Sequence, residues 1–294
     1  MVKKWLVPVS LSIFFCVSIP ILFLENDRIL AAGLPNSDST KTVNRSSTAS
    51  PKKILSILND PHNHLTKTQI DNLLLQLFQS QTVAQKHDES ILFSNPMNTT
   101  VNQYRLEDLS ALHIKDMKVK SFVQQLLDDG FKLSSSEGMI YIESDYPKLL
   151  KEYGKRSSNQ IAMYLKIKAT ETQSHYAEDA ALRITPDRLA ERILQIESFL
   201  NHYPGFMRKN ELRALHQRYL SAYLLGLNNT PAFQYGTDRI KEDFLKSYRK
   251  TMARYPKTQL AKILETYGQV LERAHYIKRP EVLKFIEDTA QANH

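Results

Sequence analysis

The sequence predicts a mainly α-helical protein that carries one small β-hairpin. Apolar residues in the C-terminal half recur every three or four positions, which is the spacing of one helix face. In residues 131–143 they alternate instead, as in a strand that is buried on one side. Only 8 of the 294 residues are glycine, which disfavours an all-β fold built on tight turns.

The first segment of the chain predicts export. Lys3 and Lys4 precede an apolar run over 5–24, and a helix of that length spans roughly 30 Å, enough to cross a bilayer. The lysines favour the cytoplasmic side, so the rest of the chain is expected outside. Small residues ending at Ala32 favour cleavage after that residue. However, the apolar run is longer than the ~7–15 residues usual for the apolar region of a signal peptide, which favours retention as an anchor. Residues 1–32 are therefore either a signal peptide or an uncleaved membrane anchor.

Three further parts follow this segment. Residues 33–52 are rich in Ser, Thr, Asn and Pro and show no apolar periodicity, which is typical of a flexible tether. Residues 53–185 are expected to form a mainly helical part that includes the hairpin. Residues 186–294 are expected to form a second part, built from helical hairpins.

The first helical patterns lie directly after the tether. One covers 54–58, and a second covers 70–78, where Thr66 or Thr68 is placed to cap its N-terminus. Residues 84–103 are polar and include an Asn-Pro step, so a loop is expected there.

A helix over 119–129 is expected next, because its apolar residues share one face and Gly130 suits the C-terminal stop. With the segment before it and the hairpin at 131–143, it resembles a winged helix-turn-helix. That class places the helix before the hairpin in the DNA major groove. Here Asp128 and Asp129 would repel phosphate, and an exported segment does not meet DNA. We therefore expect a small α+β packing unit and no nucleic-acid partner.

The region after residue 186 has the clearest helical periodicity. Short breaks separate the successive patterns, which predicts antiparallel helical hairpins. The four expected helices cover 189–203, 212–223, 240–255 and 260–274. Tyrosines recur on their apolar faces, and such tyrosines are expected in the core, with their hydroxyls reaching the surface, rather than in a ligand groove. They are Tyr203, Tyr219, Tyr223, Tyr248, Tyr255 and Tyr267.

Two of these helices end in a Tyr-Pro step. Tyr203-Pro204 and Tyr255-Pro256 lie 52 residues apart, and another helix follows each of them. Residues 187–276 thereby resemble the tetratricopeptide-like helical-repeat proteins, whose usual interval is ~34 residues. The resemblance implies stacked helix pairs whose concave face binds a partner, usually another protein. A third step, Tyr146-Pro147, is expected to begin a helix instead.

One candidate metal site comes from the segment 171–179. On a helix, Glu171 and His175 lie four residues apart, and Glu178 and Asp179 follow three and four residues later. All four side chains would then share one face, as a metal ligand set requires. An ordinary solvent-exposed acidic face explains the same pattern. We favour this second interpretation and expect no metal.

The candidate catalytic residues are the carboxylates near the hairpin, Glu137, Glu143 and Asp145. Two carboxylates within reach of each other are what a glycosidase requires. The one tryptophan of the chain is Trp5, inside the apolar run, so no tryptophan remains to form a sugar-binding platform. Charge at the hairpin turn and edge is the simpler interpretation.

Taken together, these features predict an exported, non-catalytic binding or scaffold protein at the outer face of a membrane or in a cell wall. We expect no cofactor. The formal net charge of +8 suits an anionic wall polymer as partner, and another envelope protein is equally suited. Residues 5–24 would add membrane contact if they are retained. The alternative is a cell-wall-acting hydrolase that uses the carboxylates near the hairpin.

Overall fold

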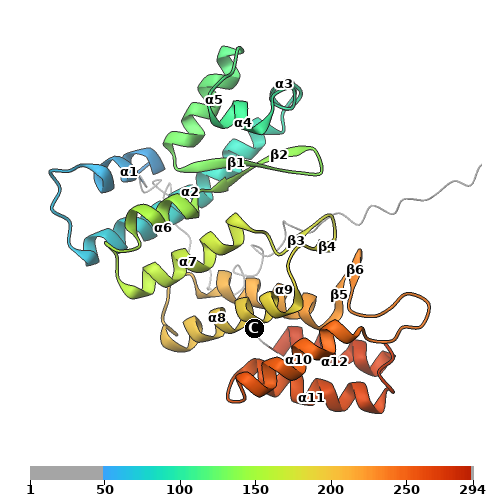
Figure 1. The fold of residues 1–294 in the computed structure, drawn as a ribbon. Coiled ribbons are helices and arrows are strands. Elements are labelled where there is room, and N and C mark those ends of the chain that lie inside the picture. The colour runs from blue at the N-terminus through green and yellow to red at the C-terminus, as the bar shows by residue number, and fades with distance from the viewer. Residues whose placement is uncertain (1–48, 293–294) are drawn as a thin grey trace, which may run out of the picture. The chain divides into compact units, whose positions relative to one another are not determined.

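The structure is a computed structural model that describes residues 49–292. The predicted signal or anchor and nearly all of the predicted tether lie outside the described residues. The described part contains twelve helices and three two-stranded antiparallel sheets (Figure 1). The prediction of a mainly α-helical fold with a small β-hairpin is confirmed. None of the described helices is long and apolar enough to span a membrane.

The two N-terminal helices begin at side-chain caps. Helix α1 (Pro51–Asn59) begins two residues before the expected start of the helical part at residue 53, because the Ser50 hydroxyl accepts a hydrogen bond from a backbone N–H of its first turn. Helix α2 (Lys67–Leu92) begins with a capping box, in which Thr66 and Gln69 each bind the other's backbone N–H. Both predicted helices are confirmed, and Thr66 is the cap.

The predicted loop over 84–103 is wrong. Helix α2 continues to Leu92, and a short helix α3 (Met97–Val101) follows. Leu92 and Val101 are each 1% exposed and belong to a second hydrophobic cluster. Burying such a side chain contributes about 1.5–3 kcal/mol. This tertiary packing stabilises helix in a segment whose polar composition suggested a loop.

The predicted helix, helix and hairpin arrangement is confirmed. Its elements are α4 (Leu106–Ser110), α5 (Met117–Asp128), β1 (Phe131–Ser136) and β2 (Met139–Ser144). Gly130, with a φ of 79°, ends α5 in the left-handed conformation. The two strands are joined by Glu137 and Gly138, whose φ values of 52° and 75° match a two-residue hairpin turn. The apolar side of the hairpin packs on α5 and completes the second hydrophobic cluster.

Successive helices then pack as pairs. The pairs are α6 (Tyr146–Tyr153) with α7 (Asn159–Gln173), α8 (Pro186–His202) with α9 (Lys209–Leu225), and α10 (Glu242–Arg254) with α11 (Gln259–Arg273). The last helix, α12 (Pro280–Ala292), packs against α9 and α11. All four helices predicted after residue 186 are confirmed.

The two Tyr-Pro stops share one backbone geometry. Tyr203 and Tyr255 both have a φ of −131°, with ψ values of 60° and 51°, and each amide donates to the carbonyl four residues earlier. Pro147 instead lies in the first turn of α6, so that step begins a helix as predicted.

Two small strand pairs that the sequence did not predict precede α8 and α10. They are β3 (Ala177–Glu178) with β4 (Ala181–Leu182), and β5 (Gly226–Leu227) with β6 (Thr230–Pro231). Gly226 has a φ of 78°, and a Cβ there would lie 2.2 Å from the backbone nitrogen of Ala232. Glycine is therefore required where α9 turns into β5. Each of the last two helix pairs follows one of these strand pairs.

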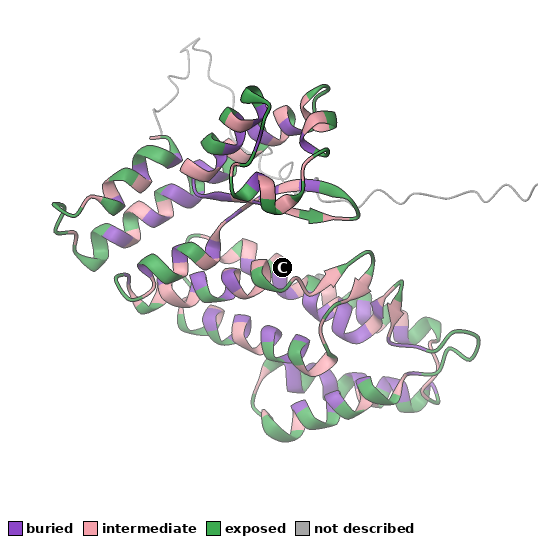
Figure 2. Ribbon diagram, turned by 45° about the horizontal axis from the view of Figure 1, so that its top comes forward, coloured by how far each residue is buried: buried purple, intermediate pink, exposed green. Residues whose placement is uncertain are grey.

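The larger hydrophobic core runs from α1 and α2 through α6–α12, where buried residues face the neighbouring helices (Figure 2). Four of the six tyrosines predicted for this core are buried, namely Tyr219, Tyr223, Tyr248 and Tyr267, and two are partly buried, Tyr203 and Tyr255. The hydroxyls of Tyr248 and Tyr267 donate to the carbonyls of Tyr223 and Leu224 at the end of α9. These tyrosines satisfy carbonyls that the helix end leaves free.

Candidate functional site

The predicted helix across 171–179 is wrong. Helix α7 ends at Gln173, and Ser174 is extended, with a φ of −151°. Glu178 lies in β3, where it pairs with Arg183 at 3.3 Å. Asp179 forms the β3–β4 turn with a φ of 49°. The four candidate metal ligands therefore do not share one helix face, because the short strand pair takes two of them away.

The structure instead joins one carboxylate from each candidate group at His175. The imidazole Nε2 lies 3.7 Å from Oε1 of Glu143 on β2, and Nδ1 lies 3.7 Å from Oε1 of Glu171 on α7. The Tyr141 hydroxyl is 3.1 Å from Nε2. We call the charged groups that meet here the His175 network. Its members are Glu143, Glu171, His175, Lys132 and Arg192.

Glu171 is held by α8 and α9. Its Oε2 accepts a 2.6 Å hydrogen bond from Arg192 on α8 and a further one from the Tyr219 hydroxyl on α9. The same guanidinium donates to the Ser174 carbonyl at 2.6 Å. The Arg192 side chain is only 10% exposed. Glu171 therefore supplies the negative charge that compensates a nearly buried arginine.

Glu143 is held by the neighbouring strand. It accepts a hydrogen bond from the Ser134 hydroxyl, and the Lys132 ammonium lies 3.0 Å from its Oε1. Lys132 also donates to the Thr172 carbonyl on α7 at 2.8 Å. The His175 network thus connects the β1–β2 hairpin to three helices of the larger core.

The charges of this network are fixed by its own members. Burial favours the neutral form of both carboxyls. The nearby positive charge of His175, with a hydrogen bond from Ser134 to Glu143 and one from Tyr219 to Glu171, outweighs burial, so both pKa values are lowered. Interaction with Glu143, and then with Glu171, raises the pKa of His175 to about 9. At neutral pH the network holds two carboxylates and an imidazolium. Such a set positions secondary structure, whereas a general acid or base requires a pKa near the working pH.

The other two candidate catalytic carboxylates lie elsewhere. Glu137 is exposed at the tip of the hairpin. Asp145 caps α6 by accepting a 3.1 Å hydrogen bond from the Lys148 amide. Glu137, Glu143 and Asp145 therefore serve three separate roles and do not form a carboxylate pair.

The candidate metal ligands do not come together as a ligand set. Among the described residues, no group of three or more His, Cys, Asp or Glu side chains is arranged to hold a metal ion.

Comparison of the chain with protein-family models, curated proteins and solved structures finds no match.

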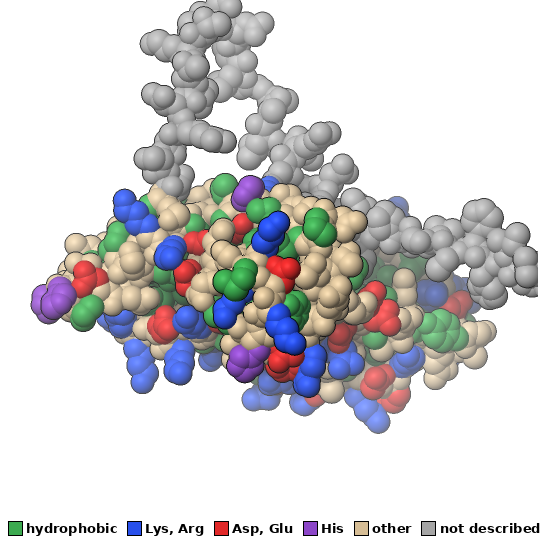
Figure 3. Space-filling view, turned by 90° about the horizontal axis from the view of Figure 1, so that it is seen from above, with side chains coloured by type: hydrophobic (Ala, Val, Ile, Leu, Met, Phe, Trp, Pro, Cys, Tyr) green, Lys and Arg blue, Asp and Glu red, His purple; other side chains and the backbone are tan. Residues whose placement is uncertain are grey.

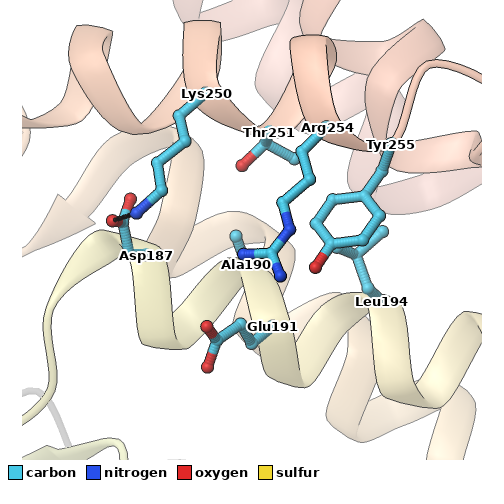
Figure 4. A pocket seen from close by; sticks show the side chains of 8 residues that line it. All are labelled: Asp187, Ala190, Glu191, Leu194, Lys250, Thr251, Arg254 and Tyr255. Atoms are coloured by element: carbon cyan, nitrogen blue, oxygen red, sulfur yellow. Dashed lines mark hydrogen bonds and ion pairs between the residues drawn. The ribbon is translucent and has the colours of Figure 1, made fainter.

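A second candidate site is a shallow groove between α8 and α10 (Figure 4). Lys250 and Asp187 bridge it with a 2.5 Å ion pair. The Arg254 guanidinium lies over the Tyr255 ring, 5.3 Å from its centre, and extends toward the wall that carries Glu191. The groove is a shallow surface feature, and the space of about 270 Å³ along it includes open solvent. It presents both charges and an aromatic edge, which suits a polar segment of a partner.

Two residues that hold Glu171 in place were not predicted from the sequence. Arg192 was missed although it lies three residues after Leu189 and four before Ile196, both on the apolar face of α8. A charged residue at such a position requires a buried partner, and this was the available signal. Tyr219 gave no comparable signal, because a tyrosine on an apolar face is usually explained by packing.

The His175 network predicts a pH-dependent stability. Because the pKa of His175 is raised to about 9 in the folded state, its contribution is fully present below ~6.5 and is lost as the pH rises through about 9. The side chain is 38% exposed, so solvent screening reduces the effect to about 1–2 kcal/mol. In urea unfolding at pH 6 to 10, His175→Gln should flatten this decline, whereas His113→Gln, at an exposed position, should leave it unchanged. A decline that is identical in both variants would show that other groups cause it.

Proposed function

We propose that this chain is an exported, non-catalytic binding or scaffold protein that acts at the outer face of a membrane or in a cell wall. One observation carries the proposal: of the three carboxylates that a hydrolase would use, Glu143 is engaged in an ion pair, Asp145 caps a helix, and Glu137 lies apart at the hairpin tip. The paired helices also expose a groove between α8 and α10. Helices that bury one face on their neighbours leave another face for a partner. Another envelope protein or an anionic wall polymer remains the proposed partner.

The proposed compartment is supported by the sequence. Lys3 and Lys4, followed by the apolar run 5–24, are typical of an export signal or an N-terminal anchor. The folded part described here would then follow on the outer side.

The hydrolase alternative receives less support from the geometry. A glycosidase requires an acid whose pKa is raised and a second carboxylate about 5–9.5 Å away. The pKa of Glu143 is lowered, and Asp145 is occupied at the N-terminus of α6. Glu143 is therefore not prepared to donate a proton near neutral pH.

The test is a pull-down of the full chain, tagged at its C-terminus and cross-linked in intact cells. Wild type should recover one dominant partner. Reversing the charge of Lys250 and Arg254 in the groove should reduce the recovered amount of that partner strongly. A matched reversal of Lys115 and Lys118, which are exposed near α5, should not. Equal recovery by both variants would exclude the groove as the binding surface.

A second assay addresses the alternative directly. Purified wild-type chain and Glu143→Gln are incubated with cell-wall material, and released fragments are measured. We expect no release by either protein. Release by wild type that Glu143→Gln abolishes would contradict a non-catalytic role and support the hydrolase.

A further inference from the structure

The first and sixth helices together carry a dense basic surface. All of its side chains are exposed, and we call it the α1–α6 basic surface. Its members are Lys52, Lys53, Lys148, Lys151, Lys155 and Arg156. The spacing of three and four residues from Lys148 to Lys155 places these lysines on one side of α6 and the turn that follows it. Figure 3 shows that Lys and Arg side chains project along one edge of the molecule, with Asp and Glu side chains among them.

Few acidic groups neutralise this surface. Helix α1 contains no Asp or Glu, and α6 contains one, Glu152. Asp128 on α5 accepts a 2.9 Å ion pair from Lys52, and its own side chain is 31% exposed. Asp129 is buried and binds the Lys52 amide at 2.8 Å. The six cations of the surface therefore lie beside one exposed carboxylate, Glu152, and one half-buried carboxylate, Asp128.

The two helices are fixed to each other. At one end, the Arg156 guanidinium donates to the Leu58 carbonyl at 3.3 Å, and the Tyr153 hydroxyl donates to the Asn59 side chain at 2.6 Å. At the other end, the charge of Lys148 helps to lower the pKa of Asp128, which pairs with α1. Because α1 is held at both ends, its two lysines keep their position beside those of α6.

The α1–α6 basic surface also lies where the chain enters the folded part. Helix α1 begins at Pro51, and 26 residues separate it from the apolar run that ends at Leu24. A flexible linker of this length has an average end-to-end distance of about 30 Å. With the expected anchor over 5–24 and the expected flexible tether, the basic surface would lie within reach of the headgroups.

The chemistry of the surface favours a charged partner over an apolar one. The large hydrophobic side chains that are exposed in the described part of the chain lie outside α1 and α6. Protein interfaces usually contain buried apolar or aromatic anchors. A surface of lysines without such anchors suits a layer of negative charge.

We propose that the α1–α6 basic surface contacts anionic phospholipid headgroups of the membrane that holds the N-terminal segment. This inference rests on the proposed placement of the protein at a membrane. Each Lys or Arg close to such a surface favours contact by about fivefold. The contact would orient the protein, so that the helix pairs α8–α9 and α10–α11 present their groove to a partner.

The test uses the full chain in phosphatidylcholine vesicles, with or without phosphatidylglycerol, and measures acetylation of each lysine by mass spectrometry. With phosphatidylglycerol, Lys148, Lys151 and Lys155 should react about fivefold more slowly, and high salt should reverse this protection. Lys246 and Lys257 near α10 are exposed controls that should not change.

Matched variants test the assignment to this surface. Replacing Lys148, Lys151 and Lys155 by glutamine should remove the protection of Lys53. Replacing Lys246, Lys257 and Lys262, which are also exposed, should preserve it. Equal unfolding midpoints in urea would confirm that both triple variants are folded.

Three results would overturn the inference. The first is equal acetylation in both vesicle types, by a chain that a flotation assay shows to be bound to both. The proposed export would then stand, and the lipid contact would fail. The second is equal protection of the α10 lysines, which would indicate nonspecific attraction. The third is equal protection when soluble polyphosphate is added to the phosphatidylcholine vesicles that lack phosphatidylglycerol. This result would assign the surface to a wall-type polymer. Failure to float with neutral vesicles would instead contradict anchoring by 5–24, while the acetylation pattern still decides the lipid contact.

Discussion

Replacing Glu211 by glutamine is expected to lower the free energy of unfolding by about 2–4 kcal/mol. Glu211 on α9 accepts hydrogen bonds from Lys168 on α7, from Arg208 at 2.7 Å and from the Tyr164 hydroxyl at 3.0 Å. The side chains of Lys168 and Arg208 are each 19% exposed. Removing the one carboxylate between them leaves two poorly solvated cations, and breaking a buried ion pair costs about 3–5 kcal/mol. Residual solvent contact places the expected loss somewhat lower.

The pH dependence of this loss has a defined sign. Burial would raise the pKa of Glu211, but the charges of Lys168 and Arg208 lower it to about 2. A lowered pKa stabilises the fold above the unfolded value of ~4.3, and this contribution is lost as the pH falls toward 2. The difference between wild type and Glu211→Gln should therefore be largest at neutral pH and shrink in acid.

Urea denaturation, followed by circular dichroism, measures both effects. Glu242→Gln is the matched control, because Glu242 pairs with Arg249 at 3.4 Å where both side chains are about 60% exposed, at 59% and 62%. An exposed pair of this kind contributes 0–1 kcal/mol. If the two variants lose the same stability, the buried ion cluster between α7 and α9 does not stabilise the fold as described.

Local patterns were sufficient to predict most of the helices. The helix that ends at Tyr203 was predicted because its apolar residues follow one face and a proline comes next. The hairpin was predicted because apolar residues alternate on both sides of a Glu-Gly turn. In both cases the signal lies within a dozen neighbouring residues, so no knowledge of the tertiary fold was needed.

The errors arose where distant packing decides the structure. Helix α2 extends to Leu92 because that side chain is buried in the second hydrophobic cluster, a contact that local composition does not reveal. Helix α7 ends before His175 because Asp179 and Ala180 adopt positive φ in the β3–β4 turn. Neither residue is a glycine, so the turn has no strong signature.

The candidate site was predicted as separate pieces. Glu143 was assigned to a possible catalytic group, and Glu171 with His175 to a possible metal group. Their meeting depends on how the hairpin packs beside α7, which spacing along the chain does not determine. Arg192 and Tyr219 both donate hydrogen bonds to Glu171. Because of these bonds, the group is interpreted as a structural network and not as a reactive site.

Glu171→Gln is the second substitution with a large expected effect, a loss of about 2–3 kcal/mol in the free energy of unfolding. Glutamine keeps the shape but removes the charge opposite Arg192, whose side chain is only 10% exposed. Arg192 keeps its 2.6 Å hydrogen bond to the Ser174 carbonyl, but this neutral group does not compensate the positive charge. The substitution also removes one of the two carboxylates that raise the pKa of His175. The high-pH loss of stability should therefore begin at a lower pH than in wild type.

A control and a second readout distinguish this effect from general damage to α7. Glu191→Gln removes an exposed partner of Arg188, where the ion pair measures 2.7 Å and the Glu191 side chain is 48% exposed, and should cost less than about 1 kcal/mol. Titration of His175 by NMR should show its pKa falling in Glu171→Gln and unchanged in Glu191→Gln. An unchanged His175 pKa together with full stability would mean that Glu171 does not organise the network, and the connection between the hairpin and the larger core would then depend on Glu143 and Lys132.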